Sequence, residues 1–336
     1  MNRKADLRLF LKINKIPLYL LIVFGLFFAS PLHAMGRRDS GNELTFYSIR
    51  GSSGVGLIRL YEEAVNINGF SLRMETLANA DLLAARFISG EARIGILPPN
   101  MAAKIASSGR DIRVAAIIGT GMLSLLTVEP SLFSIGDLRG MTVHVAGQGA
   151  TPDFVFRRIL RRHGINPEED LDLFYALSPP EIAQSLIAGR ISTALLPEPF
   201  ASMARMGNSS IRVISDIQEE WAGISTTYNG LYPMTLLVVD GAFADDYPHI
   251  LNSLLDEVKN SIAWVTAHPH EAGELVEKHE LGISSAVIRN AIPQSSYVFI
   301  PANESRLLLE ELFNVFLEYD PVSIGGELPS DTFYLY

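Results

Sequence analysis

The feature that most constrains the fold of this chain is an internal repeat. Residues 87–98 read FISGEARIGILP and residues 186–197 read LIAGRISTALLP, so an Ile, a Gly, a Leu and a Pro recur at an offset of 99 residues. In each copy the glycine suits the left-handed end of a helix, and the apolar run after it is typical of a buried strand that ends at Leu-Pro. The chain is therefore expected to contain two similar halves.

The segments before the two copies also correspond. Residues 44–49 (LTFYSI) predict a strand, followed by the loop RGSSG and an amphipathic helix from Leu57 to Ala64. Residues 141–146 (MTVHVA) predict a second strand, followed by the loop GQGAT and another helix that begins at Pro152. Alternation of this kind gives parallel sheets with helices on both faces, and such sheets bind ligands at the carboxyl ends of their strands. Two sheets in one chain imply a cleft between them.

Two further apolar segments can connect the halves. Residues 114–128 and residues 235–239 are apolar enough to carry the chain out to a second lobe and back again. Residues 245–319 show a helical period and are expected to pack on the first lobe. The sequence thus predicts an α/β protein of two doubly wound lobes joined by two crossovers.

Composition and charge exclude several kinds of protein. The chain has 336 residues, 27 Lys plus Arg, 37 Asp plus Glu and no Cys. The absence of Cys excludes disulfides, thiolate metal sites, cysteine catalysis and a lipid anchor on Cys. Residues 1–34 carry five basic residues and one acidic residue, Asp6, so their net charge is +4. Because the whole chain has a net charge of −10, residues 35–336 have a net charge of −14. A body this acidic is a poor candidate for binding the phosphate backbone of nucleic acids.

The N-terminus has the pattern of an export signal. Basic residues in the first 15 positions precede a run of 15 almost purely apolar residues, IPLYLLIVFGLFFAS, and a cleavage site is expected after Ala34 or Gly36. This run is shorter than the roughly 20 residues that span a bilayer comfortably. An uncleaved anchor is the alternative, because Leu32 is not a small residue. Either form predicts that the rest of the chain is periplasmic or otherwise extracytoplasmic.

The two loops and the strand ends supply the candidate ligand-binding residues. A loop of Gly and Ser before a helix presents free backbone N–H groups that suit a carboxylate, sulfonate, phosphate or carbonyl oxygen. Aromatic residues at strand ends are available to stack on a flat ligand. The candidates are Tyr47, Arg50, Gly51, Ser52, Ser53, Pro98, Gly147, Gln148, Gly149, Ala150, Thr151, Glu198 and Tyr228.

Glu198 has two interpretations. It lies in LPEPF, at the strand end where folds of this class hold their ligands. Pro199, however, favours the first turn of a helix, and a glutamate beside it can interact with the free N–H groups there instead. Both roles remain open at the level of the sequence.

The sequence does not match the motifs of a phosphate-binding P-loop, a hydrolase elbow or a metal site. Residues 51–56 (GSSGVG) are followed by Leu57, where a phosphate-binding P-loop needs Lys, and Val55 stands where a hydrolase elbow needs Gly. His268 and His270 flank a proline in a connection between helices, which is more typical of a solvated turn than of a metal site. We therefore expect no cofactor, no metal site and no catalytic residue.

Four longer runs resemble a known family. They are DLRG at 137–140, TVHVAGQGATPDFVFRRILRRHGI at 142–165, SPPEIAQSLIAGRISTALLPEPF at 178–200 and DYPHILNSLLDEVKNSIAWVTAHPHEA at 246–272. Together they resemble the substrate-binding proteins of ABC importers in the nitrate, sulfonate, taurine and thiamine-precursor group. The resemblance covers about residues 43–320, with LPEPF as its most specific part, and residues 324–336 resemble the tail of many such proteins.

The resemblance implies a type II periplasmic-binding fold with a ligand held between two lobes. Residues 43–120 with 235–320 would form the first lobe, residues 125–227 the second, and residues 321–336 a C-terminal tail. The implied ligand positions are Tyr47 to Ser53, Gly147 to Thr151 and Glu198. Pro99 and Asn100 depart from the pattern of the family, so the chemistry of that wall is not implied.

The expected function is that of a monomeric receptor for a small solute, which delivers its ligand to an ABC permease and its ATPase. A nitrogen heterocycle is favoured as ligand over a sulfonate or nitrate, because Glu198 would oppose an anion and could accept an N–H. One alternative is an enzyme on the same scaffold that acts on a pyrimidine- or menaquinone-type precursor. Another is a module that has lost its ligand and only contacts a membrane partner.

Overall fold

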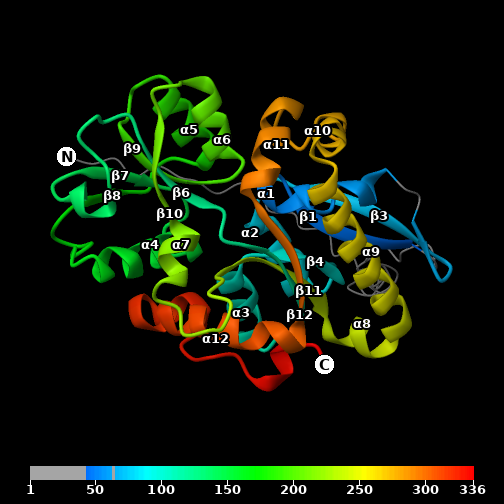
Figure 1. Cartoon of the computed structure of the whole chain (residues 1–336). Coiled ribbons are helices and arrows are strands. Elements are labelled where there is room, and N and C mark those ends of the chain that lie inside the picture. The colour runs from blue at the N-terminus through cyan, green and yellow to red at the C-terminus, as the bar shows by residue number, and fades with distance from the viewer. Residues whose placement is uncertain (1–42, 63–64) are drawn as a thin grey trace, which may run out of the picture. The chain divides into compact units, whose positions relative to one another are not determined.

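A computed structural model describes residues 43–62 and 65–336 of the chain (Figure 1). The expected signal segment at residues 1–34 lies outside the described residues. Within the described part of the chain, no helix combines the length and the apolar character needed to cross a membrane.

The first lobe is built on a seven-stranded mixed sheet. Its strands in spatial order are β12 (Ser296–Pro301), β5 (Ile112–Thr120), β11 (Pro233–Asp240), β4 (Ile94–Leu97), β1 (Glu43–Ile49), β3 (Phe70–Leu77) and β2 (Asn66–Ile67). Strand β1 pairs in parallel with β3 and β4, whereas β11 runs antiparallel to both β4 and β5. The parallel centre is the part that the strand–helix alternation predicts.

The second lobe is built on a five-stranded mixed sheet. Its strands in spatial order are β10 (Arg212–Asp216), β6 (Leu123–Thr127), β9 (Thr193–Pro197), β7 (Thr142–Val145) and β8 (Asp172–Phe174). Strand β7 pairs in parallel with β8 and β9, and β6 runs antiparallel to β9 and β10. The two copies of the sequence repeat end in β4 and β9, which occupy corresponding places beside the parallel centres.

Two crossovers join the sheets. The chain leaves the first sheet at the end of β5, turns through Gly121 and enters the second sheet as β6. It returns after α7 (Ile217–Ala222) and re-enters the first sheet as β11. Strands β6 and β11, which carry the chain into the second sheet and back into the first, run antiparallel to their neighbours. The predicted α/β fold of two lobes joined by two crossovers is confirmed.

The remaining helices cover the two sheets (Figure 1). They are α1 (Ser52–Val55), α2 (Ala80–Ser89), α3 (Pro99–Ser107), α4 (Thr151–Arg162), α5 (Pro179–Ile187), α6 (Phe200–Gly207), α8 (Gly241–Asp246), α9 (Pro248–Ala267), α10 (Pro269–Lys278), α11 (Ser285–Ala291) and α12 (Ala302–Tyr319). Short 3-10 turns lie at Ile58–Tyr61, Ile135–Leu138, Ile292–Gln294, Pro321–Ile324 and Asp331–Phe333.

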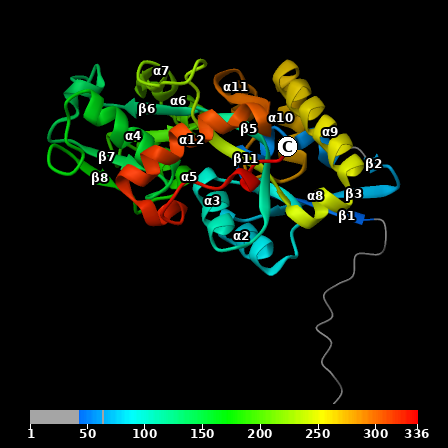
Figure 2. The same ribbon diagram turned by 90° about the horizontal axis from the view of Figure 1, so that it is seen from below.

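Helix α12 touches both lobes. It follows β12 of the first sheet, and Figure 2 shows it running beside α4 of the second lobe. Phe154 of α4 meets Phe316 edge to face at a centroid distance of 5.2 Å and stacks on Tyr319 at 5.8 Å. Glu318 accepts from Arg158 at 2.8 Å on the same side. The helical segment 245–319 therefore does not pack on the first lobe alone.

Two local predictions differ from the structure. Where a helix was expected from Leu57 to Ala64, the described residues form a 3-10 turn at Ile58–Tyr61 after the four-residue α1, and Glu63 and Ala64 lie outside the described residues. The segment expected to be helical throughout, 245–319, contains β12, whose sequence SYVFIP is rich in residues that favour strands. Its partner β5 lies far away in sequence, so the pairing is not visible in a local period.

Candidate functional site

A cavity of about 790 Å³ lies between the two lobes. The first lobe lines it with residues at 49–53, 78–81, 98, 100–101, 118–119, 234–235, 281–283 and 297. The second lobe lines it with residues at 146–148, 150–152, 178–180, 197 and 200, and Met122 of the first crossover also contributes. Most of these residues follow the carboxyl ends of strands, which is where α/β sheets bind their ligands. A volume of this size suits a small organic molecule.

The first-lobe loop, residues 50–53, joins β1 to α1. Gly51 has φ 107° and ψ −152°, a backbone region that is nearly restricted to glycine. No side chain caps α1, and the Tyr297 hydroxyl donates to the carbonyl of Ser52 at 3.3 Å. The loop also makes two backbone hydrogen bonds, from Arg50 N to the carbonyl of Leu77 at the end of β3 and from Gly54 N to the carbonyl of Gly51.

The second-lobe loop, residues 147–151, joins β7 to α4. Gly147 and Gly149 have φ of 83° and 71°, so both positions favour glycine. The amide of Gly149 donates to Asp153 Oδ2 at 2.9 Å, which fixes the loop to the first turn of α4. Thr151 begins that helix, and its side chain is 2% exposed.

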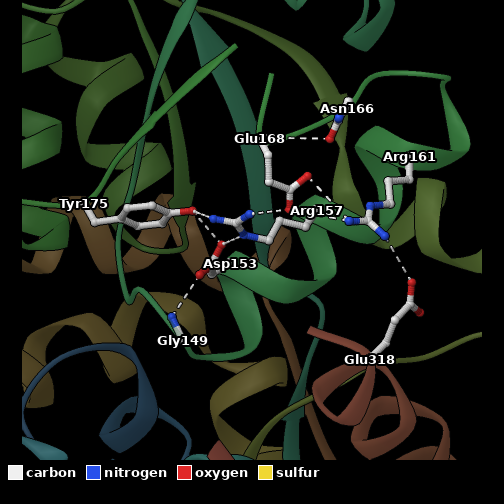
Figure 3. Close-up of polar contacts among 8 residues, drawn as sticks. All are labelled: Gly149, Asp153, Arg157, Arg161, Asn166, Glu168, Tyr175 and Glu318. Carbon is white, nitrogen blue, oxygen red and sulfur yellow. Dashed lines mark hydrogen bonds and ion pairs between the residues drawn. The ribbon is translucent and has the colours of Figure 1, made fainter. Parts of the chain in front are cut away.

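Asp153 connects the second-lobe loop to a larger polar network (Figure 3). Its Oδ1 accepts from Arg157 Nε and from the Tyr175 hydroxyl, each at 2.6 Å, and its side chain is 3% exposed. Arg157 also reaches Glu168 at 3.1 Å. Burial raises the pKa of Tyr175, and its hydrogen bond to Asp153 adds to this shift. The loop thus rests on a partly buried, multiply bonded support.

The structure brings together nine of the thirteen expected ligand residues. Those that line the cavity are Arg50, Gly51, Ser52, Ser53, Pro98, Gly147, Gln148, Ala150 and Thr151. The other four are Tyr47, Gly149, Glu198 and Tyr228, which are not part of the lining. Arg50 and Asp81 are the charged members of the lining, so the fixed charges of the cavity wall balance.

Glu198 lies behind the cavity wall at the start of α6. Its side chain is buried, and its carboxylate accepts from the amide of Ser202 at 3.1 Å. Burial raises the pKa of Glu198, while hydrogen bonds from Ser202 oppose the shift. This is the helix-terminal role that the sequence left open as an alternative to ligand contact.

Tyr47 is buried, whereas Tyr228 is exposed to solvent. Tyr47 is buried in the first lobe, with the Arg86 guanidinium 5.1 Å from its ring centroid. Tyr228 belongs to the returning crossover and is 88% exposed. Neither ring contributes to the cavity wall.

Several lining residues were not anticipated from the sequence. They include Asn79, Asp81, Asn100, Met101, Met122, Ser178, Phe200, Met234, Leu281 and Tyr297. Asn79 caps α2, and Ser178 forms a capping box with Glu181, so their cap signatures could have placed them at the carboxyl ends of strands. Tyr297 gave no such signal, because it reaches the cavity from a strand that lies within a helical segment.

Comparison with protein families finds a match to the NMT1-like family over residues 92–278. Comparison with curated proteins finds no match. One similar solved structure is an ABC transporter from Parabacteroides distasonis, with a TM-score of 0.76 and 24% identity, covering 88% of this chain and 99% of that one.

Two other solved structures share the architecture. The periplasmic aliphatic sulphonate binding protein SsuA from Escherichia coli has a TM-score of 0.69 and 15% identity, covering 88% of this chain and 94% of that one. The periplasmic nitrate-binding protein NrtA from Synechocystis PCC 6803 has a TM-score of 0.61 and 12% identity, covering 84% of each chain. These likenesses confirm the type II periplasmic-binding fold.

Proposed function

The chain belongs to the NMT1-like family, and from this premise we propose that it is an extracytoplasmic receptor for a small solute. It captures the solute between its two lobes and delivers it to the permease of an ABC importer. The observation that carries this proposal is the cavity, because both lobes supply its wall through loops at strand ends. An N-terminal export signal at residues 1–34 would bring the chain to that location, and the absence of Cys leaves no site for a lipid anchor.

The composition of the cavity supports binding rather than catalysis. Its lining includes neither His nor Cys, and its charged members are Arg50 and Asp81. A receptor needs only complementary contacts, whereas an enzyme needs groups positioned to move protons or attack a substrate.

We favour a nitrogen heterocycle over a sulfonate or nitrate as the ligand class. Three methionines, Phe200 and Tyr297 give the wall a large apolar component, which suits a flat organic molecule. Nitrate has four heavy atoms and would leave most of about 790 Å³ unfilled. Because Glu198 lies behind the wall, the preference rests on these lining residues.

Mass spectrometry of the solute released from the protein tests the function. The mature protein is purified without refolding and then denatured, and the released solute is compared before and after incubation with fresh protein. We expect a small molecule that the protein returns unchanged. Conversion of that solute into a product would instead support an enzyme.

Small-angle scattering tests the role of the two lobes. We propose that residues 43–120 with 235–320 move against residues 125–227 when solute bridges them. The radius of gyration should fall at saturating solute, since a ligand that contacts both lobes favours the closed form. An unchanged radius would contradict closure between these lobes.

A further inference from the structure

The first crossover consists of two residues, Gly121 and Met122, which join β5 to β6. Their φ angles are 60° and 71°, so both residues lie in the left-handed region. Glycine adopts this region freely, whereas a residue with a Cβ atom does so at a cost in free energy. Met122 is therefore a strained residue at the point where the chain passes from one lobe to the other.

Backbone hydrogen bonds hold the crossover in this conformation. The amide of Gly121 donates to the carbonyl of Tyr232 in the returning crossover at 3.1 Å. The carbonyl of Met122 accepts from the amide of Glu198, which follows β9, at 2.8 Å. Neither bond involves the side chain of Met122, so both could form with glycine at this position. A side chain that is kept in a strained backbone points to a role for that side chain.

The end of the Met122 side chain lies against Gly119. A Cβ atom added at Gly119 would lie 2.8 Å from the terminal methyl group, Cε, of Met122. Gly119 pairs with Thr235 of β11 on one side and with Tyr297 of β12 on the other. These four residues all line the cavity, and we call them the cavity floor. Met122 is partly exposed there, so a solute in the cavity can reach it.

Gly119 makes room for Met122. Its φ lies outside the left-handed region, so its backbone does not require glycine. Glycine within a strand weakens the strand and often marks a place where another group approaches closely. Here the methyl group of Met122 occupies the space that a Cβ atom would take. Two unfavourable choices, a left-handed methionine and a glycine in a strand, thus combine to place one thioether on the cavity floor.

We propose that Met122 binds a planar ring of the solute through its thioether and thereby selects planar over saturated solutes. The sulfur of methionine makes favourable contacts with aromatic rings, and a saturated ring does not reproduce them. Tyr297 adds an aromatic side chain to the same floor. This inference rests on the proposed receptor function and adds to it a specificity-determining residue and the chemical feature that this residue recognises.

Titration calorimetry on variants tests the proposal. The probes are the solute released from the wild-type protein and two matched pairs, uracil with 5,6-dihydrouracil and benzenesulfonate with cyclohexanesulfonate. Each pair keeps its polar groups and differs in the ring. The variants are Met122→Ala, Met122→Gly, Gly119→Ala and the double variant with alanine at both positions. Met206→Ala is the matched control, because Met206 is 49% exposed on α6 and does not line the cavity.

We expect the wild-type protein to bind the planar member of at least one pair more tightly than its saturated partner. Met122→Ala and Met122→Gly should each weaken binding of that planar probe and of the released solute about fivefold, within the range of a lost contact between sulfur and an aromatic ring. Met206→Ala should leave both affinities unchanged. In urea, Met122→Gly should unfold at a higher concentration than Met122→Ala, because glycine relieves the left-handed strain.

Gly119→Ala tests the contact from the other side. The new Cβ atom displaces only the flexible end of the Met122 side chain, so the urea midpoint should change little. The affinity for the same probes should nevertheless fall about fivefold, because the thioether is moved off the cavity floor. In the Met122→Ala background the same change should have no further effect on affinity, since the displaced group is absent.

Three results would overturn the proposal and leave the receptor function standing. The first is equal affinity of wild type and Met122→Ala for the released solute and for every planar probe that binds. The second is a loss of affinity in Gly119→Ala that is just as large in the Met122→Ala background. The third is a released solute without a planar ring, or equal binding of the two members of each pair that binds. A wild-type protein that binds no probe and releases no solute would overturn the receptor function as well.

Discussion

The two loops that flank the cavity each join a strand to a helix, but they are supported differently. The first-lobe loop, residues 50–53, leads into a four-residue helix without a side-chain cap. The second-lobe loop, residues 147–151, is bonded to Asp153, which also holds Arg157 and Tyr175. A glycine-containing turn between a strand and a helix therefore does not by itself indicate how firmly the loop is held. The second lobe provides a preorganised surface, and the first lobe meets it with a loop whose hydrogen bonds, from Arg50 to Leu77 and from Tyr297 to Ser52, all go to backbone carbonyls.

Removal of Asp153 should have the largest effect on stability. Asp153→Ala leaves Arg157 without its buried partner and releases the amide of Gly149. We expect the free energy of unfolding in urea to fall by about 3 kcal/mol, the lower end for a broken buried pair, because Arg157 keeps Glu168.

The matched change in the other loop is Ser52→Ala. Ser52 takes part through its backbone carbonyl, so this variant should stay within about 0.5 kcal/mol of wild type. Losses of equal size in the two loops would show that they are supported alike.

Replacing Gly51 and Gly149 by alanine should destabilise the protein by different amounts, because the two glycines have different backbone angles. A Cβ added at Gly51 or Gly149 would meet no atom within 4 Å, so packing does not enter. Gly51 has φ 107° and ψ −152°, and Gly51→Ala should cost about 2 kcal/mol. Gly149 has φ 71°, closer to the left-handed helical region, and Gly149→Ala should cost about 1 kcal/mol. Thermal unfolding of both variants measures the two losses of stability. A larger loss for Gly149→Ala than for Gly51→Ala would contradict the prediction.

The sequence predicted the positions of the two loops, but it did not predict the contacts that support them. The strand–loop–helix order predicted both loops, because strand alternation and Gly-rich turns are local patterns. Asp153, in contrast, acts through Tyr175, which lies 22 residues further along the chain, and local patterns do not show which buried groups will meet. For the same reason Tyr297 was not among the predicted site residues, whereas Asn100 was left out because Pro99 and Asn100 depart from the family pattern.

The assignment of Glu198 shows a second limit of the sequence. LPEPF placed a carboxylate at the correct strand end, but the backbone turns it toward Ser202 rather than into the cavity. Side-chain direction depends on the turn that follows the strand. The predicted boundaries of the lobes and the predicted ligand contacts stay predictions.

Protonation of Glu198, in the second lobe, should make a smaller contribution to the free energy of unfolding, and this contribution should depend on pH. Burial raises its pKa above the ordinary value of 4.5. The folded state therefore binds the proton more tightly than the unfolded state does. Its stabilising contribution is complete below pH 4.5 and is lost as the pH rises through the raised pKa.

The variant Glu198→Gln keeps the shape of the side chain and removes the titration. The stability of wild type relative to this variant should be higher at pH 5 than at pH 7.5, measured by urea unfolding at each pH. A difference that does not change with pH would mean that Glu198 is not desolvated, and the second-lobe wall would then be more open than the structure indicates.

The smallest effect is expected at Tyr228, in the crossover that returns to the first lobe. Its side chain is 88% exposed and does not line the cavity, unlike Tyr297, whose hydroxyl supports the first-lobe loop. Tyr228→Ala should change the free energy of unfolding by less than about 0.5 kcal/mol, because little surface is buried there. Affinity for the released solute, measured by calorimetry, should match that of wild type. A marked loss of affinity would mean that the crossover folds over the ligand in the bound form, and the cavity would then have a third wall besides the two loops.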